Sequence, residues 1–228
     1  MRRSFESPHW TRHFFYRAEH TRTTWRFRFG LAATLVLAIW LTRGWLSVVI
    51  ADSLVCSGSA APSDAILVEN FDPTYLAFET AARLRKAGVA SRVLVPVARN
   101  QNDSDVNRVY RGVAELMADI SHIGTIELVP IREVEPISLN AAGDILQFIE
   151  RERIRSVVVV TPLFRSRRSQ LVYEATLGAA GVAVTCEPIR ADRNRDTWSH
   201  SWHGIQNVLE QWIKLQYYRL YVLPFQTS

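Results

Sequence analysis

Three arginines follow closely after a run of four valines. The segment from Ser156 to Gly181 reads SVVVVTPLFRSRRSQLVYEATLGAAG, which predicts a buried strand, a short turn and a helix. Arg165, Arg167 and Arg168 lie in that turn. Ligands bind at the carboxyl ends of strands in open α/β sheets, and guanidinium groups pair well with phosphates and carboxylates. We therefore expect an anion site with Arg168 and Arg165 as its main residues; the alternative is an exposed basic helix start that forms salt bridges.

A second polar group follows the first predicted strand. Glu69, Asn70 and Asp72 come after the apolar run that begins at Asp64. In a parallel sheet they fall at the same edge as the arginines. Two nearby carboxylates could bind a metal ion or act as an acid and a base, whereas the alternative is a solvated loop with an Asx turn. We include Glu69 in the candidate site.

A third polar group stands before a predicted helix and contains Glu135, Ser138 and Asn140. Asn140 could hydrogen-bond a ligand, and Glu135 could accept a hydroxyl or position water. Ser138 could instead cap the helix, because a serine oxygen accepts from the free N–H groups there. The two roles are compatible, and we expect all three residues to line the wall opposite the arginines.

Other chemistry has little support in the sequence. His200 and His203 lie three residues apart without a third ligand, so no metal site is predicted. Phosphate-binding loops, serine-hydrolase motifs and paired-cysteine motifs are absent. Cys56 and Cys186 are the two cysteines, and the sequence does not decide whether they form a disulfide.

Strand-like and helix-like segments alternate from Asp64 onward. The strands are predicted at 64–69, 91–97, 125–131, 156–161 and 182–187, and the helices at 74–88, about 105–120, 138–153, 167–180 and 198–223. This alternation predicts an α/β, Rossmann-like three-layer sandwich with a largely parallel five-stranded sheet. The strand order stays open. The last helix is rich in aromatic residues and either packs on the domain or lies against a membrane.

The net charge of +5 arises in the N-terminal tail. Residues 1–28 carry seven arginines and two acidic residues, whereas the remaining chain holds 20 basic and 20 acidic residues. A neutral domain gives no electrostatic footprint for nucleic acid, so no nucleic-acid partner is predicted.

Residues 29–51 form an apolar segment of 23 residues, long enough to span a bilayer as one transmembrane helix. Arg43 opposes insertion by about 2.5–3.5 kcal/mol, or less where it snorkels. The arginine-rich tail precedes this segment, so residues 1–28 are predicted to be cytoplasmic. Residues 52–63 would be a linker, and residues 64–228 a periplasmic or extracellular domain anchored in the inner (plasma) membrane. A cleaved signal peptide, cut near Ser59–Ala61, is the alternative.

The order of these segments resembles the YdcF/SanA/ElyC-type envelope family, a domain of unknown function numbered 218. The resemblance rests on five features: the membrane segment leading to DAILV at 64–68, AARL at 81–84 with Gly88, RVLV at 92–95, Glu135-x-x-Ser138-x-Asn140, and VVT at 159–161 followed by Arg168 and the aromatic C-terminal helix. It implies a Rossmann-like domain that acts in envelope maintenance. On resemblance alone, S-adenosylmethionine is a candidate cofactor.

Two departures from the family pattern bear on function. Glu69 and Asn70 stand where the family has a glycine-rich turn, and Arg165 stands where it has a histidine. Because an arginine does not shuttle protons near neutral pH, the sequence favours binding over acid–base catalysis at that position. The first hypothesis is therefore a membrane-anchored protein that binds an anionic small molecule or a lipid-linked phosphate. The alternatives are a transferase or hydrolase of an envelope precursor, and a non-catalytic membrane scaffold.

Overall fold

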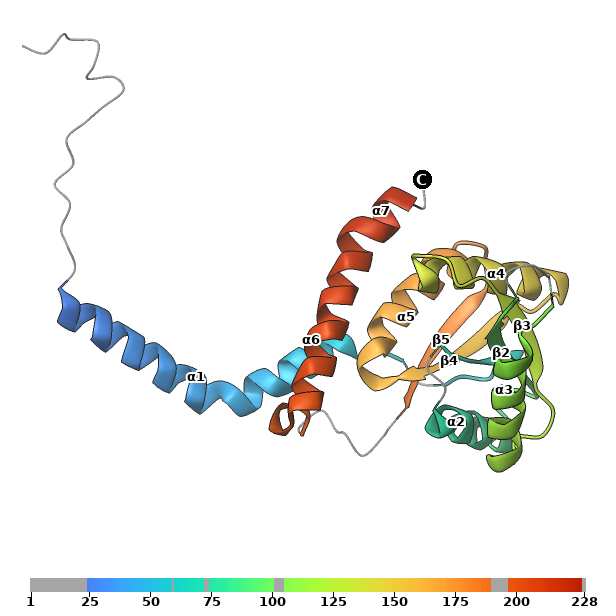
Figure 1. The fold of residues 1–228 in the computed structure, drawn as a ribbon, viewed down its shortest axis with the longest axis horizontal. Coiled ribbons are helices and arrows are strands. Elements are labelled where there is room, and N and C mark those ends of the chain that lie inside the picture. The colour runs from blue at the N-terminus through green and yellow to red at the C-terminus, as the bar shows by residue number, and fades with distance from the viewer. Residues whose placement is uncertain (1–23, 59, 72–73, 101–104, 190–196, 227–228) are drawn as a thin grey trace, which may run out of the picture. The chain divides into compact units, whose positions relative to one another are not determined.

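The computed structural model describes residues 24–226 except 59, 72–73, 101–104 and 190–196. Figure 1 shows the elements. In chain order they are α1 (Trp25–Leu54), β1 (Ala65–Val68), α2 (Tyr75–Lys86), β2 (Arg92–Ala98), α3 (Arg108–Ile120), β3 (Glu127–Ile131), α4 (Ile137–Arg151), β4 (Ser156–Pro162), η2 (Leu163–Arg165), α5 (Ser166–Tyr173), η3 (Glu174–Gly178), β5 (Ala183–Ile189), η4 (Trp198–His200), α6 (Trp202–Tyr217), η5 (Tyr218–Val222) and α7 (Leu223–Gln226).

The five strands form one sheet in which every pairing is parallel. The fold predicted from the sequence is therefore confirmed, and the structure adds the strand order β3-β2-β1-β4-β5. β1 pairs with β2 on one side and with β4 on the other. After β1 the chain turns toward β2 and β3, whereas after β4 it turns toward β5. The topology thus reverses between β1 and β4.

Alternate residues of the central strands contribute to two separate hydrophobic cores. Val157 and Val159 face the core beneath α4 and α5, and Val158 and Val160 face the core beneath α2 and α3. Figure 1 shows these helix pairs on opposite faces of the sheet. The run of valines is explained by this burial on both faces, because parallel strands covered by helices have no polar side.

The chain divides into two compact units, residues 1–43 and residues 44–228. α1 begins in the first unit and ends in the second. It is long and apolar enough to cross a membrane, and every side chain from Trp25 to Trp45 is exposed. Its last residues, within the second unit, instead pack on the domain. Ala51 and Leu54 are fully buried in a third core, together with Phe164, Trp198, Val208 and Leu215.

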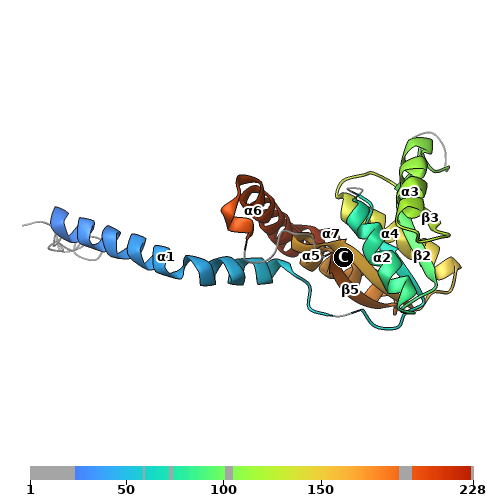
Figure 2. The ribbon, with the colours of Figure 1, turned by 90° about the horizontal axis from the view of Figure 1, so that it is seen from below.

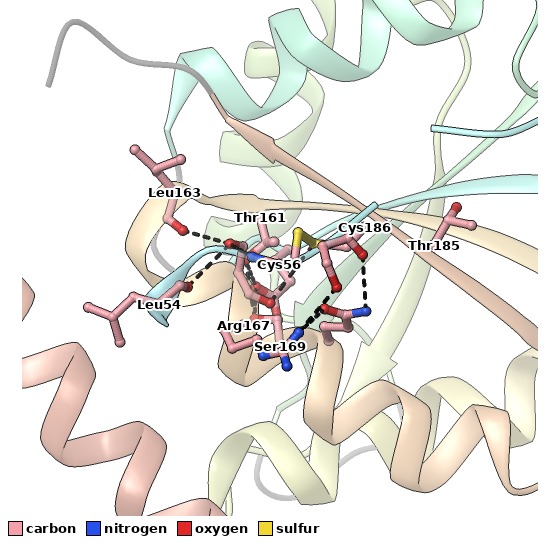
Figure 3. Close-up of a disulfide and its surroundings, with 12 residues drawn as sticks. Leu54, Cys56, Thr161, Leu163, Arg167, Ser169, Thr185 and Cys186 are labelled. Atoms are coloured by element: carbon pink, nitrogen blue, oxygen red, sulfur yellow. Dashed lines mark hydrogen bonds between the residues drawn. A yellow bond between two sulfur atoms is a disulfide. The ribbon is translucent and has the colours of Figure 1, made fainter. Parts of the chain in front are cut away.

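A disulfide joins Cys56, just after α1, to Cys186 in β5, with a Cα–Cα separation of 6.4 Å. Figure 3 shows this cross-link beside the start of α5, where Arg167 and Ser169 lie. The Cys56 N–H also donates to the fully buried Ser166 Oγ at 2.9 Å. The sequence left the pairing open because 130 residues separate the two cysteines.

The C-terminal helical region, predicted as one helix over 198–223, is broken near Ser201. Ser201 caps α6 by accepting from the Gly204 N–H at 3.1 Å. A Cβ atom on Gly204 would lie 2.1 Å from the Trp198 carbonyl oxygen. No side chain fits there, so the break and the packing of α6 on η4 depend on this glycine.

Replacing Gly204→Ala is therefore expected to lower the free energy of unfolding by about 1–3 kcal/mol, since the backbone of η4 or α6 must shift. Thermal unfolding of the full chain in mild detergent measures this change. Gly143→Ala in α4 is the matched control. It meets no atom within 4 Å, and it should raise stability by up to about 1 kcal/mol through helix propensity. Equal effects of the two substitutions would contradict the close packing at Gly204.

Candidate functional site

The candidate site lies at the carboxyl ends of β1 and β4, where the topology of the sheet reverses. Ligands of open α/β sheets bind at such a switch point, because the loops after the two strands separate there. Glu69 follows β1, and its N–H donates to the Val160 carbonyl of β4 at 2.9 Å. Thr161 lies near the end of β4. The strand pairing therefore places Glu69 and Thr161 side by side.

Glu69 is a buried carboxylate held by hydroxyl groups, with an exposed fraction of 3%. Its Oε2 accepts from Ser169 Oγ at 2.7 Å and from Thr161 Oγ1. Thr161 Oγ1 and Ser169 Oγ are also 3.2 Å apart. These contacts join the ends of β1 and β4 to α5. The alternative of a solvated loop is wrong for Glu69, because strand pairing draws its side chain beneath α5.

Arg168 is buried beside Glu69, with an exposed fraction of 6%. Its Nη2 donates to Gln211 Oε1 of α6 at 3.2 Å, and its guanidinium lies 5.4 Å from the ring centre of Tyr218. Burial lowers the pKa of Arg168, and the positive charge of Arg165 lowers it further. The alternative of an exposed, salt-bridged helix start is therefore wrong for Arg168. Figure 1 and Figure 2 both show α6 next to α5.

Arg165 lies one helical turn before Arg168 and faces the loop after β1. Its guanidinium is 5.2 Å from the ring centre of Phe71. Within the described ranges, neither Arg165 nor Arg168 forms an ion pair with a carboxylate. Two positive charges are thus held near each other in a mostly buried place, with the buried Glu69 and the more exposed Glu210 as nearby negative charges.

Buried polar atoms without a hydrogen-bond partner gather at this site. In the described part of the chain there are four such side-chain atoms: Asn70 Oδ1, Arg165 Nε, Arg168 Nε and Tyr173 OH. Tyr173 is buried, and burial raises the pKa of its hydroxyl well above its ordinary value; the charge of the nearby Glu69 carboxylate and a weak hydrogen-bond interaction with it raise this pKa further. An unpaired buried polar atom costs about 1–3 kcal/mol, so four of them in one place require a reason.

Comparisons of the chain with protein-family models, curated proteins and solved structures find no match. The site is therefore interpreted from its own geometry.

The third polar group predicted from the sequence does not share a contact with the arginines. Glu135 is exposed, and its Oε2 accepts from the Ile137 N–H at 3.4 Å. Asn140 Nδ2 donates to the carbonyls of Val134 and Pro136 at 2.9 and 3.4 Å. These side chains are engaged locally at the start of α4. Within the described residues, their hydrogen bonds do not reach Glu69 or Arg168.

Helix capping by Ser138, the other interpretation of that residue, is wrong. Pro136 occupies the capping position of α4 and offers no side-chain acceptor. Ser138 lies inside the first turn and is buried. The helix begins earlier than its apolar pattern indicates, because Pro136 already has the extended backbone that a cap requires.

The remaining predicted residues divide between the site and its surroundings. Arg167 is exposed and donates to Ser57 Oγ and Gln170 Oε1, each at 3.3 Å, away from Glu69. Asn70 belongs to the site, and Asp72 lies outside the described residues. No group of three metal-binding side chains is found in the described segments, and Ser201 separates His200 in η4 from His203 in α6.

Five residues of the site were not singled out from the sequence: Thr161, Ser169, Tyr173, Gln211 and Tyr218. The position of Thr161 at the end of a buried strand was the available signal, because strand ends bind ligands in this fold class. Ser169 directly follows Arg168, and Tyr173 follows Ser169 after four residues. Both therefore lie on the buried side of α5. Gln211 and Tyr218 had no signal, because nothing in the sequence places α6 against α5.

Proposed function

We propose that the domain binds an anion, as a free phosphate-type ligand or as the phosphate of a lipid-linked molecule, at the carboxyl ends of β1 and β4. The observation that supports this is the cluster of four unpartnered buried polar atoms around Glu69. Three of them are donors, on Arg165, Arg168 and Tyr173, and of these the Tyr173 hydroxyl is also close to the Glu69 carboxylate. Phosphate oxygens accept from such donors, and the ligand would repay the desolvation of both guanidinium groups.

The fourth unpartnered atom defines the ligand further. Asn70 Oδ1 is an acceptor, so it needs a donor on the ligand. Glu69 also accepts hydrogen bonds and repels a second negative charge. A ligand that suits the site therefore carries one anionic group toward Arg165 and Arg168 and a hydroxyl or amine toward Asn70. A bare divalent cation does not suit it, because the two arginines repel a cation.

A membrane-anchored, extracytoplasmic domain is the second part of the proposal. The exposed part of α1 from Trp25 to Trp45 has a length of about 30 Å, which matches the apolar thickness of a bilayer. Arg43 then lies near one end of this stretch, where it can snorkel. The disulfide supports an oxidising compartment, and the arginine-rich tail supports a cytoplasmic N-terminus. A role in envelope maintenance rests on the resemblance to the YdcF/SanA/ElyC-type family.

Binding of two probes by the full chain in mild detergent tests the anion site. The probes are inorganic phosphate and farnesyl monophosphate, measured by the rise in unfolding temperature against sodium chloride of equal ionic strength. Arg168→Ala is expected to weaken binding about 10- to 100-fold, because it removes charge-assisted hydrogen bonds. A shift with farnesyl monophosphate alone would identify a lipid-linked ligand, and a shift with both would identify the phosphate group as sufficient.

Arg167→Ala is the matched control, because it removes an arginine side chain at the neighbouring position, where the side chain is exposed. It should leave binding unchanged. Without a ligand, Arg168→Ala should lower the stability of the protein, because it removes the contacts with Gln211 and Tyr218 and leaves the buried Glu69 carboxylate with less positive charge nearby. Binding is therefore measured as the rise in unfolding temperature over each variant's own value without ligand. The proposed anion site would be overturned if neither probe raised the unfolding temperature of the wild-type chain. It would also be overturned if Arg168→Ala and Arg167→Ala lost the same binding affinity.

A further inference from the structure

The C-terminal helical region carries a continuous exposed apolar face. Its residues recur at intervals of three and four, which places them along one side of α6, η5 and α7. All are exposed, from 39% at Ile205 to 72% at Trp202 and Phe225. We call this the aromatic face: Trp202, Ile205, Leu209, Trp212, Ile213, Tyr217, Leu220, Tyr221 and Phe225. Tyr217 and Tyr221 stack with ring centres 5.5 Å apart.

A different side of the same helices packs on the domain. Val208 and Leu215 are buried in the third core, and Tyr218 and Val222 are buried beneath α4 and α5. The expected packing of this helix on the domain therefore accounts for one side only. Between the two sides runs a polar stripe with Glu210 and Lys214, which form an ion pair. The aromatic face is thus an apolar stripe that the domain itself does not cover.

The beginning of α6 is tied to the segment that directly follows the candidate membrane span. Trp198 Nε1 donates to the Ser47 carbonyl at 3.0 Å, and Ser47 lies two residues after Trp45. Val208 shares its core with Ala51 and Leu54. A chain whose α1 crosses a bilayer must therefore hold the start of α6 within about one or two helical turns of the bilayer surface.

We propose that the aromatic face lies on the surface of the phospholipid bilayer. Tryptophan and tyrosine rings favour this interface, because one part of the ring is apolar and the other forms hydrogen bonds. The polar stripe then faces water and headgroups, as in other interfacial amphipathic helices. The bilayer is adjacent to every copy of the anchored chain.

The proposal has a consequence for the candidate site, and this consequence rests on the proposed function. The domain-facing side of α6 supplies Gln211, and η5 supplies Tyr218; both contact Arg168. The helix that lies on the membrane is therefore also a wall of the anion site. Because α6 carries the aromatic face on one side and Gln211 on the other, the anion site would lie about one helix diameter from the bilayer surface, which favours a ligand whose phosphate is carried on a lipid.

Photo-crosslinking of the full chain in its native membrane tests the docking without any ligand. Trp212→benzoylphenylalanine and Leu209→benzoylphenylalanine place the probe on the aromatic face. The matched control is Lys214→benzoylphenylalanine on the polar stripe of the same helix, and Leu37→benzoylphenylalanine in α1 is the reference for lipid contact. Mass spectrometry of the irradiated protein distinguishes a phospholipid adduct from a cross-linked dimer.

We expect phospholipid adducts at positions 212 and 209 in a yield close to that at position 37, and a much lower yield at position 214. A cross-linked dimer at 212 and 209 would overturn the proposal and show that a second copy covers the face. Phospholipid adducts at position 37 without adducts at positions 212 and 209 would also overturn it. Phosphate binding by the detergent-solubilised chain does not depend on this result, so the two proposals fail separately.

Discussion

Replacing Cys56→Ala and Cys186→Ala together is expected to lower the free energy of unfolding of the residue 44–228 unit by about 2–5 kcal/mol. The two cysteines are 130 residues apart in the sequence. A cross-link over so long a loop removes much of the conformational entropy of the unfolded chain. Since a folded domain has a total stability of about 5–15 kcal/mol, the variant loses a large share of it.

The same double substitution is expected to weaken phosphate binding. The Cys56 N–H donates to Ser166 Oγ, and Ser166 lies between Arg165 and Arg168. Ser166 Oγ also donates to the Leu163 carbonyl at 2.6 Å, so one hydroxyl connects the cross-linked segment to the turn before α5. Without the disulfide this segment is held by weaker contacts, and the two guanidinium groups lose part of their fixed position.

Urea unfolding of the full chain in mild detergent, followed by near-ultraviolet circular dichroism, measures the stability change. The single variant Cys56→Ala should lose as much stability as the double variant, because either one removes the same bond. Reduced wild-type protein should unfold near the same urea concentration as the variants. If the oxidised wild type and the double variant unfolded at the same urea concentration, the disulfide would contribute nothing to the free energy of unfolding.

The sheet is the part of the structure that the sequence predicts well. Each strand is a short apolar run between turn residues, and burial on both faces leaves a strong signal, as in Val157–Val160. Gly88 and Gly181 also have positive φ angles of 75° and 84°, where glycine is favoured after a helix. Strands and helix ends of this kind are determined by residues that are neighbours in the chain, so they can be predicted from a short stretch of sequence.

The candidate site could be predicted only in part, because it joins residues that are distant in the chain. Arg165, Arg168 and Glu69 were found, since the carboxyl ends of parallel strands share one edge of the sheet. Gln211 and Tyr218 were not, because the sequence does not fix the position of α6. Asn140 was assigned to the site from its type and neighbours, whereas its amide donates to carbonyls before α4.

Glu69→Gln is expected to change stability and phosphate affinity in opposite directions. Oε2 of Glu69 accepts from Ser169 and Thr161, and its charge lies near Arg165 and Arg168. Removing that charge weakens these hydrogen bonds and should lower the free energy of unfolding by about 1–3 kcal/mol. The same change removes the repulsion of an anionic ligand, so inorganic phosphate should bind about tenfold more tightly.

Glu150→Gln near the end of α4 is the matched control, because Glu150 is exposed and lies before β4, away from the arginines. Solvent screens its charge, so both stability and phosphate affinity should stay close to those of the wild type. Titration of each variant with inorganic phosphate, together with its urea unfolding curve, gives the two values. A lower phosphate affinity in Glu69→Gln would mean that the carboxylate holds the ligand through a donor group, as Asn70 is expected to do. Phosphate affinity would then depend on this contact as well as on the positive charge of the arginines.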